Sequence, residues 1–160
     1  MNKPTDLADY HYAAIGMVVV ETARLEATMC RAVWRALGLS EIDGQVVTSH
    51  MDRSALFYAL HSLASRCTRC RCLDGLIDNL QAIDALLKER DFMLRAQWRV
   101  AMPDGIAIAS AYLDHEDGAF VSRALPFAAM VNMRQTAQVQ REALERWIRL
   151  TATEPCVDGT

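Results

Sequence analysis

The segment Leu86–Trp98, LLKERDFMLRAQW, carries charged side chains at a spacing that could handle a phosphate group. Asp91 and Arg95 are four positions apart, and side chains with this spacing are neighbours on one face of an α-helix. Arg90 precedes them directly and Trp98 follows. A guanidinium binds phosphate or carboxylate oxygens through paired N–H groups and stays protonated at physiological pH. These residues therefore allow anion binding or transition-state stabilisation, but the arginines cannot shuttle protons.

A long helical pattern positions this segment. Apolar residues recur at steps of three and four, and an arginine occupies one position of the stripe: Leu73, Leu76, Leu80, Ile83, Leu87, Arg90 and Leu94. The spacing predicts a helix from about Leu73 to Trp98 with Arg90 facing the interior. An inward arginine must extend its charged end to solvent, line a cleft, or pair with an acid such as Glu21 or Glu26.

The order Glu89-Arg90-Asp91, three residues, Arg95, two residues and Trp98 resembles the motif of HEPN-type domains. These domains are four-helix bundles, and many are ribonucleases of toxin–antitoxin and phage-defence systems. In many bacterial relatives an Asn or Asp follows the arginine, and a His stands where this chain has Arg95. The organisation is similar as well, since a long first helix precedes the motif and a last helix follows a hairpin.

The resemblance implies that Arg90, Asp91 and Arg95 form the catalytic site of a metal-independent ribonuclease that needs no cofactor. In the family, the arginine and its polar neighbour act on the scissile phosphate and the 2′-hydroxyl, and the histidine serves in acid–base catalysis. Because Arg95 replaces that histidine, we expect a degenerate member without standard ribonuclease activity. It would bind RNA or an antitoxin-type protein, or form a homodimer.

The alternative is a non-enzymatic helical homodimeric interaction protein with no active site. In that case Arg90 pairs with an acid inside its own domain, and Asp91 and Arg95 form an ordinary pair on the helix surface. Trp98 then only fills the end of the helical domain.

The remaining pattern predicts an all-α, four-helix-bundle-like domain over residues 1–153. A first helix of roughly 30 residues would begin at Thr5 or Asp6 and end at Gly38. Its inner face would be Ala8, Tyr12, Ile15, Val19, Thr22, Leu25, Met29, Ala32 and Ala36. The segment Ser40–Ser49 is ambiguous because Gly44 weakens a helix. A second helix is predicted over Asp52–Ser65, with Leu56, Ala59, Leu60 and Leu63 inside.

A small β-hairpin is predicted at about 99–123, before the last helix. Pro103-Asp104-Gly105 and the DHEDG segment at 114–118 are turn signals. They delimit strands over Arg99–Met102 and Ile106–Leu113, with Ala119–Arg123 as a candidate third.

The last helix is expected to begin near Pro126. Its inner face would be Met130, Met133, Ala137, Gln140, Leu144, Trp147 and Thr151. Residues 154–160 are expected to form a flexible C-terminal tail.

The link Arg66–Cys72 combines three arginines with three cysteines. Arg66, Arg69 and Arg71 are candidates for nucleic-acid phosphate contacts, or they belong to a solvated turn. Cys67, Cys70 and Cys72 supply three thiolates where a tetrahedral metal site needs four ligands, so no metal site is assigned. Neighbouring arginines would lower the pKa of these thiols, which makes a redox or metal sensor a third hypothesis.

Composition excludes several function classes. The chain has 160 residues, 52% hydrophobic and 23% charged, with a net charge of −3, so no overall basic field attracts nucleic acid or anionic lipid. We expect neither a signal peptide nor a membrane-spanning helix. The cysteine count is odd, 5, which is typical of reduced thiols and favours a cytoplasmic location.

Overall fold

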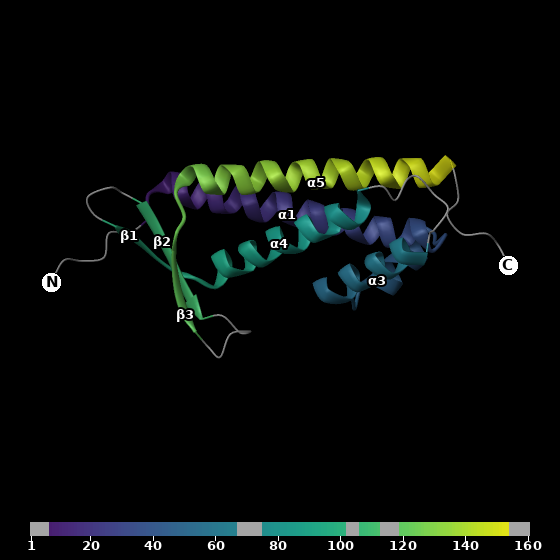
Figure 1. Ribbon diagram of the computed structural model, residues 1–160, viewed down its shortest axis with the longest axis horizontal. Coiled ribbons are helices and arrows are strands. Elements are labelled where there is room, and N and C mark those ends of the chain that lie inside the picture. The colour runs from purple at the N-terminus through teal and green to yellow at the C-terminus, as the bar shows by residue number, and fades with distance from the viewer. Residues whose placement is uncertain (1–6, 67–74, 102–105, 113–118, 154–160) are drawn as a thin grey trace.

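The computed structural model describes residues 7–66, 75–101, 106–112 and 119–153. The elements in chain order are α1 (Asp9–Ala36), α2 (Glu41–Thr48), α3 (Arg53–Arg66), α4 (Leu76–Arg95), β1 (Gln97–Ala101), β2 (Ile106–Tyr112), β3 (Phe120–Ala124) and α5 (Phe127–Thr153). The chain is mainly helical, and a small sheet lies at one end of the long helices (Figure 1). The expected helical fold with a β insertion before the last helix is confirmed at this level.

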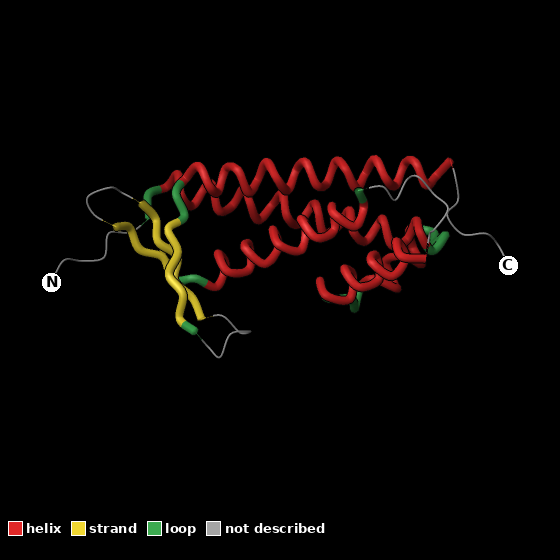
Figure 2. The backbone as a smooth tube through the Cα atoms, in the orientation of Figure 1, coloured by secondary structure: helices red, strands yellow, loops and turns green. Residues whose placement is uncertain are grey.

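The two longest helices, α1 and α5, lie side by side along most of the molecule and run in the same direction (Figures 1 and 2). Contacts at both ends fix this arrangement. Tyr10 packs edge-to-face on Phe127 near the sheet, with ring centroids 5.6 Å apart. At the far end, the Arg35 guanidinium donates to the Thr151 carbonyl oxygen over 3.1 Å. The predicted inner face of α5 is confirmed at Met130, Ala137, Leu144, Trp147 and Thr151, which are all buried.

The inner face predicted for α1 is correct only in its second half. Thr22, Leu25, Met29 and Ala32 are buried as expected. Tyr12, however, is 56% exposed. The first turns bury His11, Ala14 and Val18 instead, because a second core cluster of β2, the end of α4 and the start of α5 lies against that side of the helix. Gly38 follows the helix with a φ of 65°, as expected of a helix end, while Thr5 and Asp6 lie outside the described residues.

The ambiguous segment after α1 is a helix, α2. Ser40 caps it, since its side-chain oxygen accepts a hydrogen bond from the Asp43 backbone N–H. Gly44 is required by packing, because a Cβ added there would lie 2.3 Å from Trp34 Cγ. The Trp34 indole N–H donates to the Thr48 hydroxyl over 3.0 Å, which holds the ring in place.

Gly44→Ala is expected to destabilise the fold by about 1–3 kcal/mol, because the added methyl overpacks against the Trp34 ring. Gly16→Ala is the matched control, since a Cβ at Gly16 would meet nothing within 4 Å. At protein concentrations low enough that self-association does not contribute, that change is expected to stabilise α1 by about 0.5–1 kcal/mol through helix propensity. Urea unfolding of both variants measures the change in the free energy of unfolding. A stabilising effect of Gly44→Ala, like that expected for Gly16→Ala, would contradict the packing role of Gly44.

Helices α3 and α4 pack on α1 and complete the larger core cluster. On α3, Leu56 and Leu60 are buried as predicted, whereas Ala59 and Leu63 are only half-buried. On α4, the predicted stripe is buried at Leu76, Leu80, Ile83 and Leu87, and Leu73 lies outside the described residues.

The predicted end of the helix that carries the motif is wrong. Helix α4 ends at Arg95, and Trp98 lies in strand β1. Leu94 is 51% exposed, and the interior beyond Arg90 is filled by Phe92 and Met93. The sheet packs against this end of the helix, so the buried side no longer follows the stripe.

The sheet is antiparallel with the order β1-β2-β3, so the predicted hairpin is present and the candidate third strand extends it. Trp98 pairs with Ala109, which pairs with Arg123 across the next ladder. Ala107, Ala109 and Ala111 are buried against the helices, because alternate residues of a strand share one face. The predicted turns at 103–105 and 114–118 and the tail at 154–160 lie outside the described residues.

Candidate functional site

Arg90 points into the domain, as the stripe predicted, and it is paired. Its side chain is 13% exposed. Nη1 contacts Glu26 Oε2 on α1 over 3.0 Å, and Nη2 donates to Asp91 Oδ1 over 2.8 Å. Nε donates to the same Asp91 oxygen over 3.1 Å. Of the predicted acids, Glu26 is therefore the partner from the first helix.

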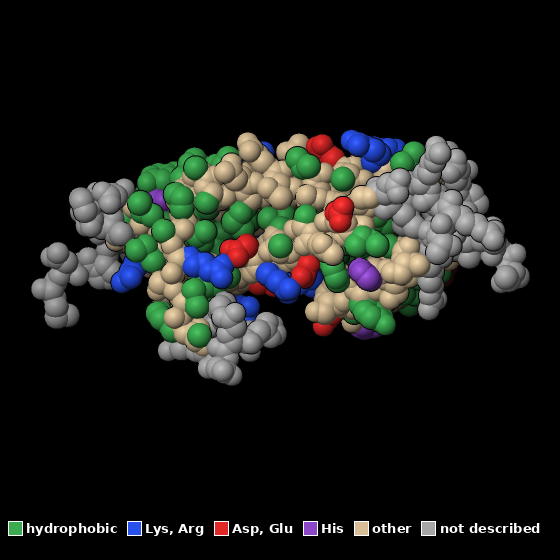
Figure 3. Space-filling view, viewed as in Figure 1, with side chains coloured by type: hydrophobic (Ala, Val, Ile, Leu, Met, Phe, Trp, Pro, Cys, Tyr) green, Lys and Arg blue, Asp and Glu red, His purple; other side chains and the backbone are tan. Residues whose placement is uncertain are grey.

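Asp91 is shared between two arginines. Its second carboxylate oxygen accepts a hydrogen bond from Arg53 Nη1 on α3. Glu26, Arg53, Arg90 and Asp91, here called the Arg90 cluster, thus join α1, α3 and α4. Two guanidinium charges face two carboxylate charges, so the cluster is formally neutral. In the view of Figure 3, basic and acidic side chains are interspersed across the middle of the molecule rather than segregated.

The electrostatics of Arg90 favour a permanent ion pair. Burial alone lowers the pKa of its guanidinium, but the hydrogen bonds to Glu26 and Asp91 outweigh that effect, and the net shift is upward. A group that is charged at every accessible pH cannot act as an acid or base. Its Nε, Nη1 and Nη2 atoms all contact acids of the same chain, so two carboxylates compete with any phosphate for this guanidinium.

Arg95 is placed differently from Arg90. It lies in the last turn of α4, its side chain is exposed, and its Nε donates to the Asp91 backbone carbonyl oxygen over 3.3 Å. Basic residues commonly hydrogen-bond the last carbonyls of a helix in this way. The structure thus brings Arg90 and Asp91 together in a half-buried cluster, with Arg95 on the surface beside it. Trp98 donates its indole N–H to the Met93 carbonyl oxygen over 3.1 Å, which closes the turn from helix to strand.

Arg66 ends α3, and Arg69 and Arg71 lie outside the described residues, as do Cys67, Cys70 and Cys72. The predicted phosphate contacts and the sensor hypothesis for this link therefore stay predictions.

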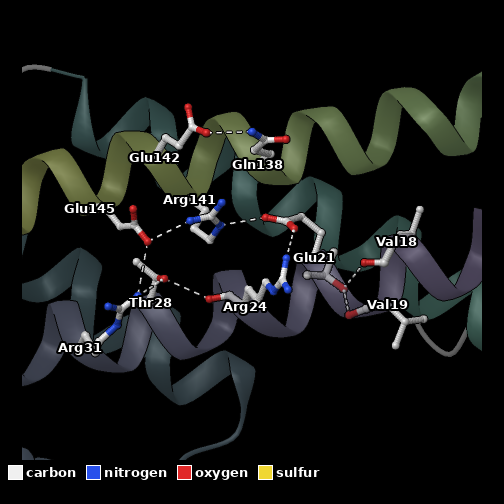
Figure 4. A network of polar contacts seen from close by, with 11 residues as sticks. Val18, Val19, Glu21, Arg24, Thr28, Arg31, Gln138, Arg141, Glu142 and Glu145 are labelled. Carbon is white, nitrogen blue, oxygen red and sulfur yellow. Dashed lines mark hydrogen bonds and ion pairs between the residues drawn. The ribbon is translucent and has the colours of Figure 1, made fainter.

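A second polar network, which the sequence analysis did not identify, joins α1 to α5 (Figure 4). Glu21 is almost fully buried, and Arg141 Nε donates to its carboxylate over 2.8 Å. Arg24 contacts the other Glu21 oxygen over 3.2 Å, and Arg141 also reaches Glu145 over 3.0 Å. A weak signal was present in the sequence, since Glu21 and Arg141 each directly adjoin a position of a predicted inner face, Thr22 and Gln140 respectively.

The hydrogen bond from Arg141 lowers the pKa of Glu21, and this effect exceeds the opposing effect of burial. Because the pKa of Glu21 is lower in the folded state than its ordinary value of 4.5, its ionised form stabilises the fold above pH 4.5. This stability is lost as the pH falls through the folded-state pKa. We therefore expect the urea midpoint to fall as the pH drops below the usual glutamate range. The same titration on Glu21→Leu/Arg141→Leu should show a smaller fall, and equal falls would contradict a role for Glu21.

The outer face of the sheet holds a hollow lined by Gln97, Arg99, Ser110, Phe120 and Ser122, together with Trp98. The Ser110 and Ser122 hydroxyls are 2.8 Å apart and hydrogen-bonded across β2 and β3. Phe120 is 56% exposed at the rim. A basic, an aromatic and two hydroxyl side chains therefore converge on this face.

Comparison with known proteins adds no assignment: the chain matches no family model, no curated protein and no solved structure. Within the described segments, His, Cys, Asp and Glu side chains form no group of three or more that could hold a metal ion. None of the helices there is both long and apolar enough to cross a membrane.

Proposed function

We propose that the chain is a HEPN-like, four-helix-bundle-like domain that lacks ribonuclease activity and acts by homotypic binding. The observation that carries the non-catalytic part is the pairing of Arg90 with Glu26 and Asp91 of its own chain. The non-enzymatic alternative predicts that Arg90 pairs with an acid inside its own domain, and this pairing agrees with it. Arg95 supplies no group that titrates near neutrality, so general acid–base catalysis has no donor at that position.

An RNA cleavage assay in the presence of a chelator tests this proposal. Wild-type protein is expected to cleave single-stranded RNA no faster than Arg90→Ala or Arg95→Ala. Arg95→Ala is the better control, because Arg95 is exposed and its side chain does not belong to the Arg90 cluster. Cleavage by the wild type that either variant abolishes, with its fold intact, would overturn the proposal.

RNA binding without cleavage is the second candidate, and the hollow on the sheet favours it. Single-stranded nucleic acids stack bases on aromatic side chains and place phosphates near basic ones, which Phe120 and Arg99 offer here. Phe120→Ala is expected to weaken RNA binding by about 1–3 kcal/mol if this candidate holds. A fluorescence titration measures the change in RNA affinity. Val139→Ala is the matched control, because it removes an exposed apolar side chain from α5 rather than from the sheet.

A further inference from the structure

The solvent-facing side of α1 is apolar over several turns. Between Asp9 and Arg24 no exposed position is charged; the exposed residues are Tyr10, Tyr12, Ala13, Gly16, Met17, Val20 and Ala23. Val20 is 52% exposed, although it stands in the middle of this run. The solvent side of a surface helix normally carries polar and charged residues, and a contiguous apolar exception marks an interaction surface.

Gly16 lies at the centre of this surface, and the fold of the single chain does not require a glycine at this position. A Cβ at Gly16 would meet nothing within 4 Å, and the residue has no positive φ. Glycine weakens a helix interior relative to alanine, so the position costs stability without an internal gain. A glycine does allow a second helix backbone to approach closely.

The same region is concave. Ala13, Gly16, Met17 and Val20 line a hollow whose walls include Glu21, Arg24 and Arg134. The hollow can receive side chains of modest size, such as those that flank it on α1.

We propose that this surface binds a second copy of the chain, with the two α1 helices antiparallel about a two-fold axis between Gly16 and Met17. The inference names the partner and the interface of the homotypic binding proposed above, and therefore rests on it. An isologous contact needs a self-complementary surface. Ala13 would face the partner's Val20, and Asp9 would face the partner's Arg24.

Charge complementarity favours a second copy of the chain as the binding partner. Asp9 lies seven positions before Gly16, and Arg24 lies seven positions after Met17, so the antiparallel arrangement brings opposite charges together at both ends. Arg24 is 65% exposed and Asp9 is exposed, so both are accessible to a partner. A parallel arrangement would place Asp9 opposite Asp9 and Arg24 opposite Arg24, which are like charges. The negative charge of Asp9 also disfavours docking on an anionic membrane.

Sedimentation equilibrium of the intact chain tests the interface. Wild type is expected to dimerise, and Gly16→Leu is expected to raise the dissociation constant at least about tenfold, because two leucines would meet at the crossing point. A Cβ at Gly16 would meet nothing within 4 Å, and urea unfolding of Gly16→Leu checks that the variant is folded. Val20→Arg should weaken the dimer similarly. Val139→Arg, at a 60% exposed valine on α5, is the matched control and should not.

A double-mutant cycle with neutral replacements makes the geometry testable. Asp9→Asn and Arg24→Gln should each weaken the dimer, and the double variant should be no weaker than the weaker of the two single variants. A dimer that Gly16→Leu leaves unchanged, or single effects that add in the double variant, overturns this interface but leaves homotypic binding standing. A wild-type monomer at every concentration overturns both proposals. Binding of that monomer to anionic lipid vesicles would assign the surface to a membrane instead.

Discussion

Arg90→Met is expected to lower the free energy of unfolding by about 3 kcal/mol, because it removes the arginine that contacts Glu26 and leaves Asp91 with Arg53 alone. Glu26 and Asp91 are 30% and 28% exposed, so water relieves part of that cost. Methionine has a similar length and keeps the apolar contacts of the stem. The loss should therefore report the ion pairs rather than a cavity.

Arg95→Met is the matched control for this experiment. It removes the same group from the surface end of the same helix, and it is expected to change stability by no more than about 0.5 kcal/mol. Urea unfolding followed by far-ultraviolet circular dichroism measures both variants. Equal effects of the two substitutions would show that the burial of Arg90 does not distinguish it from Arg95.

Arg141→Leu is expected to cost about 3 kcal/mol, because it leaves the Glu21 carboxylate buried with little compensation. The Glu21 side chain is 8% exposed, and Arg141 supplies its shortest hydrogen bond, 2.8 Å. Replacing both residues by leucine should recover most of the loss, since well-packed apolar side chains often substitute for a buried ion pair without a net cost.

Chemical denaturation of Arg141→Leu and of Glu21→Leu/Arg141→Leu tests this expectation. The double variant should be at least about 1 kcal/mol more stable than the single one. A double variant as unstable as the single one would indicate that the network is needed for packing or helix register, and would contradict a purely electrostatic role.

Much of the architecture could be predicted from the sequence, because helical periodicity is strong wherever a helix packs on one side only. Leu80, Ile83 and Leu87 on α4 are buried as their spacing indicates. The same reasoning placed Arg90 inside, and Glu26 is one of the two acids, Glu21 and Glu26, that it offered as possible partners. The arginine that interrupts the stripe is thus a real inward residue, and its partners come from α1 and from the next position of α4.

Periodicity failed where the contact surface changes along one helix. The first half of α1 and the end of α4 both pack near the sheet, so the buried side there is not the one that continues the stripe. Tyr12 and Leu94 were therefore predicted inside and are exposed. Trp98 was assigned to the helix because nothing local stops it, and strand pairing with Ala109 decides its conformation.

Pairing partners from distant elements are the part of the candidate site that local sequence could not supply. Arg53 reaches Asp91 from α3, and Arg141 reaches Glu21 from α5. Each contact depends on how helices far apart in the chain are aligned. Gly44 is similar, because its glycine requirement comes from the ring of Trp34 on another helix.

The central claim is that Arg90 is held by acids of its own chain rather than kept available for a phosphate. A double-mutant cycle on unfolding free energies tests it most directly, with Glu26→Gln, Arg90→Met and the double variant. The account predicts a coupling energy of at least about 1 kcal/mol between the two positions. Additive effects, with no coupling, would contradict the account and would leave Arg90 available for a ligand.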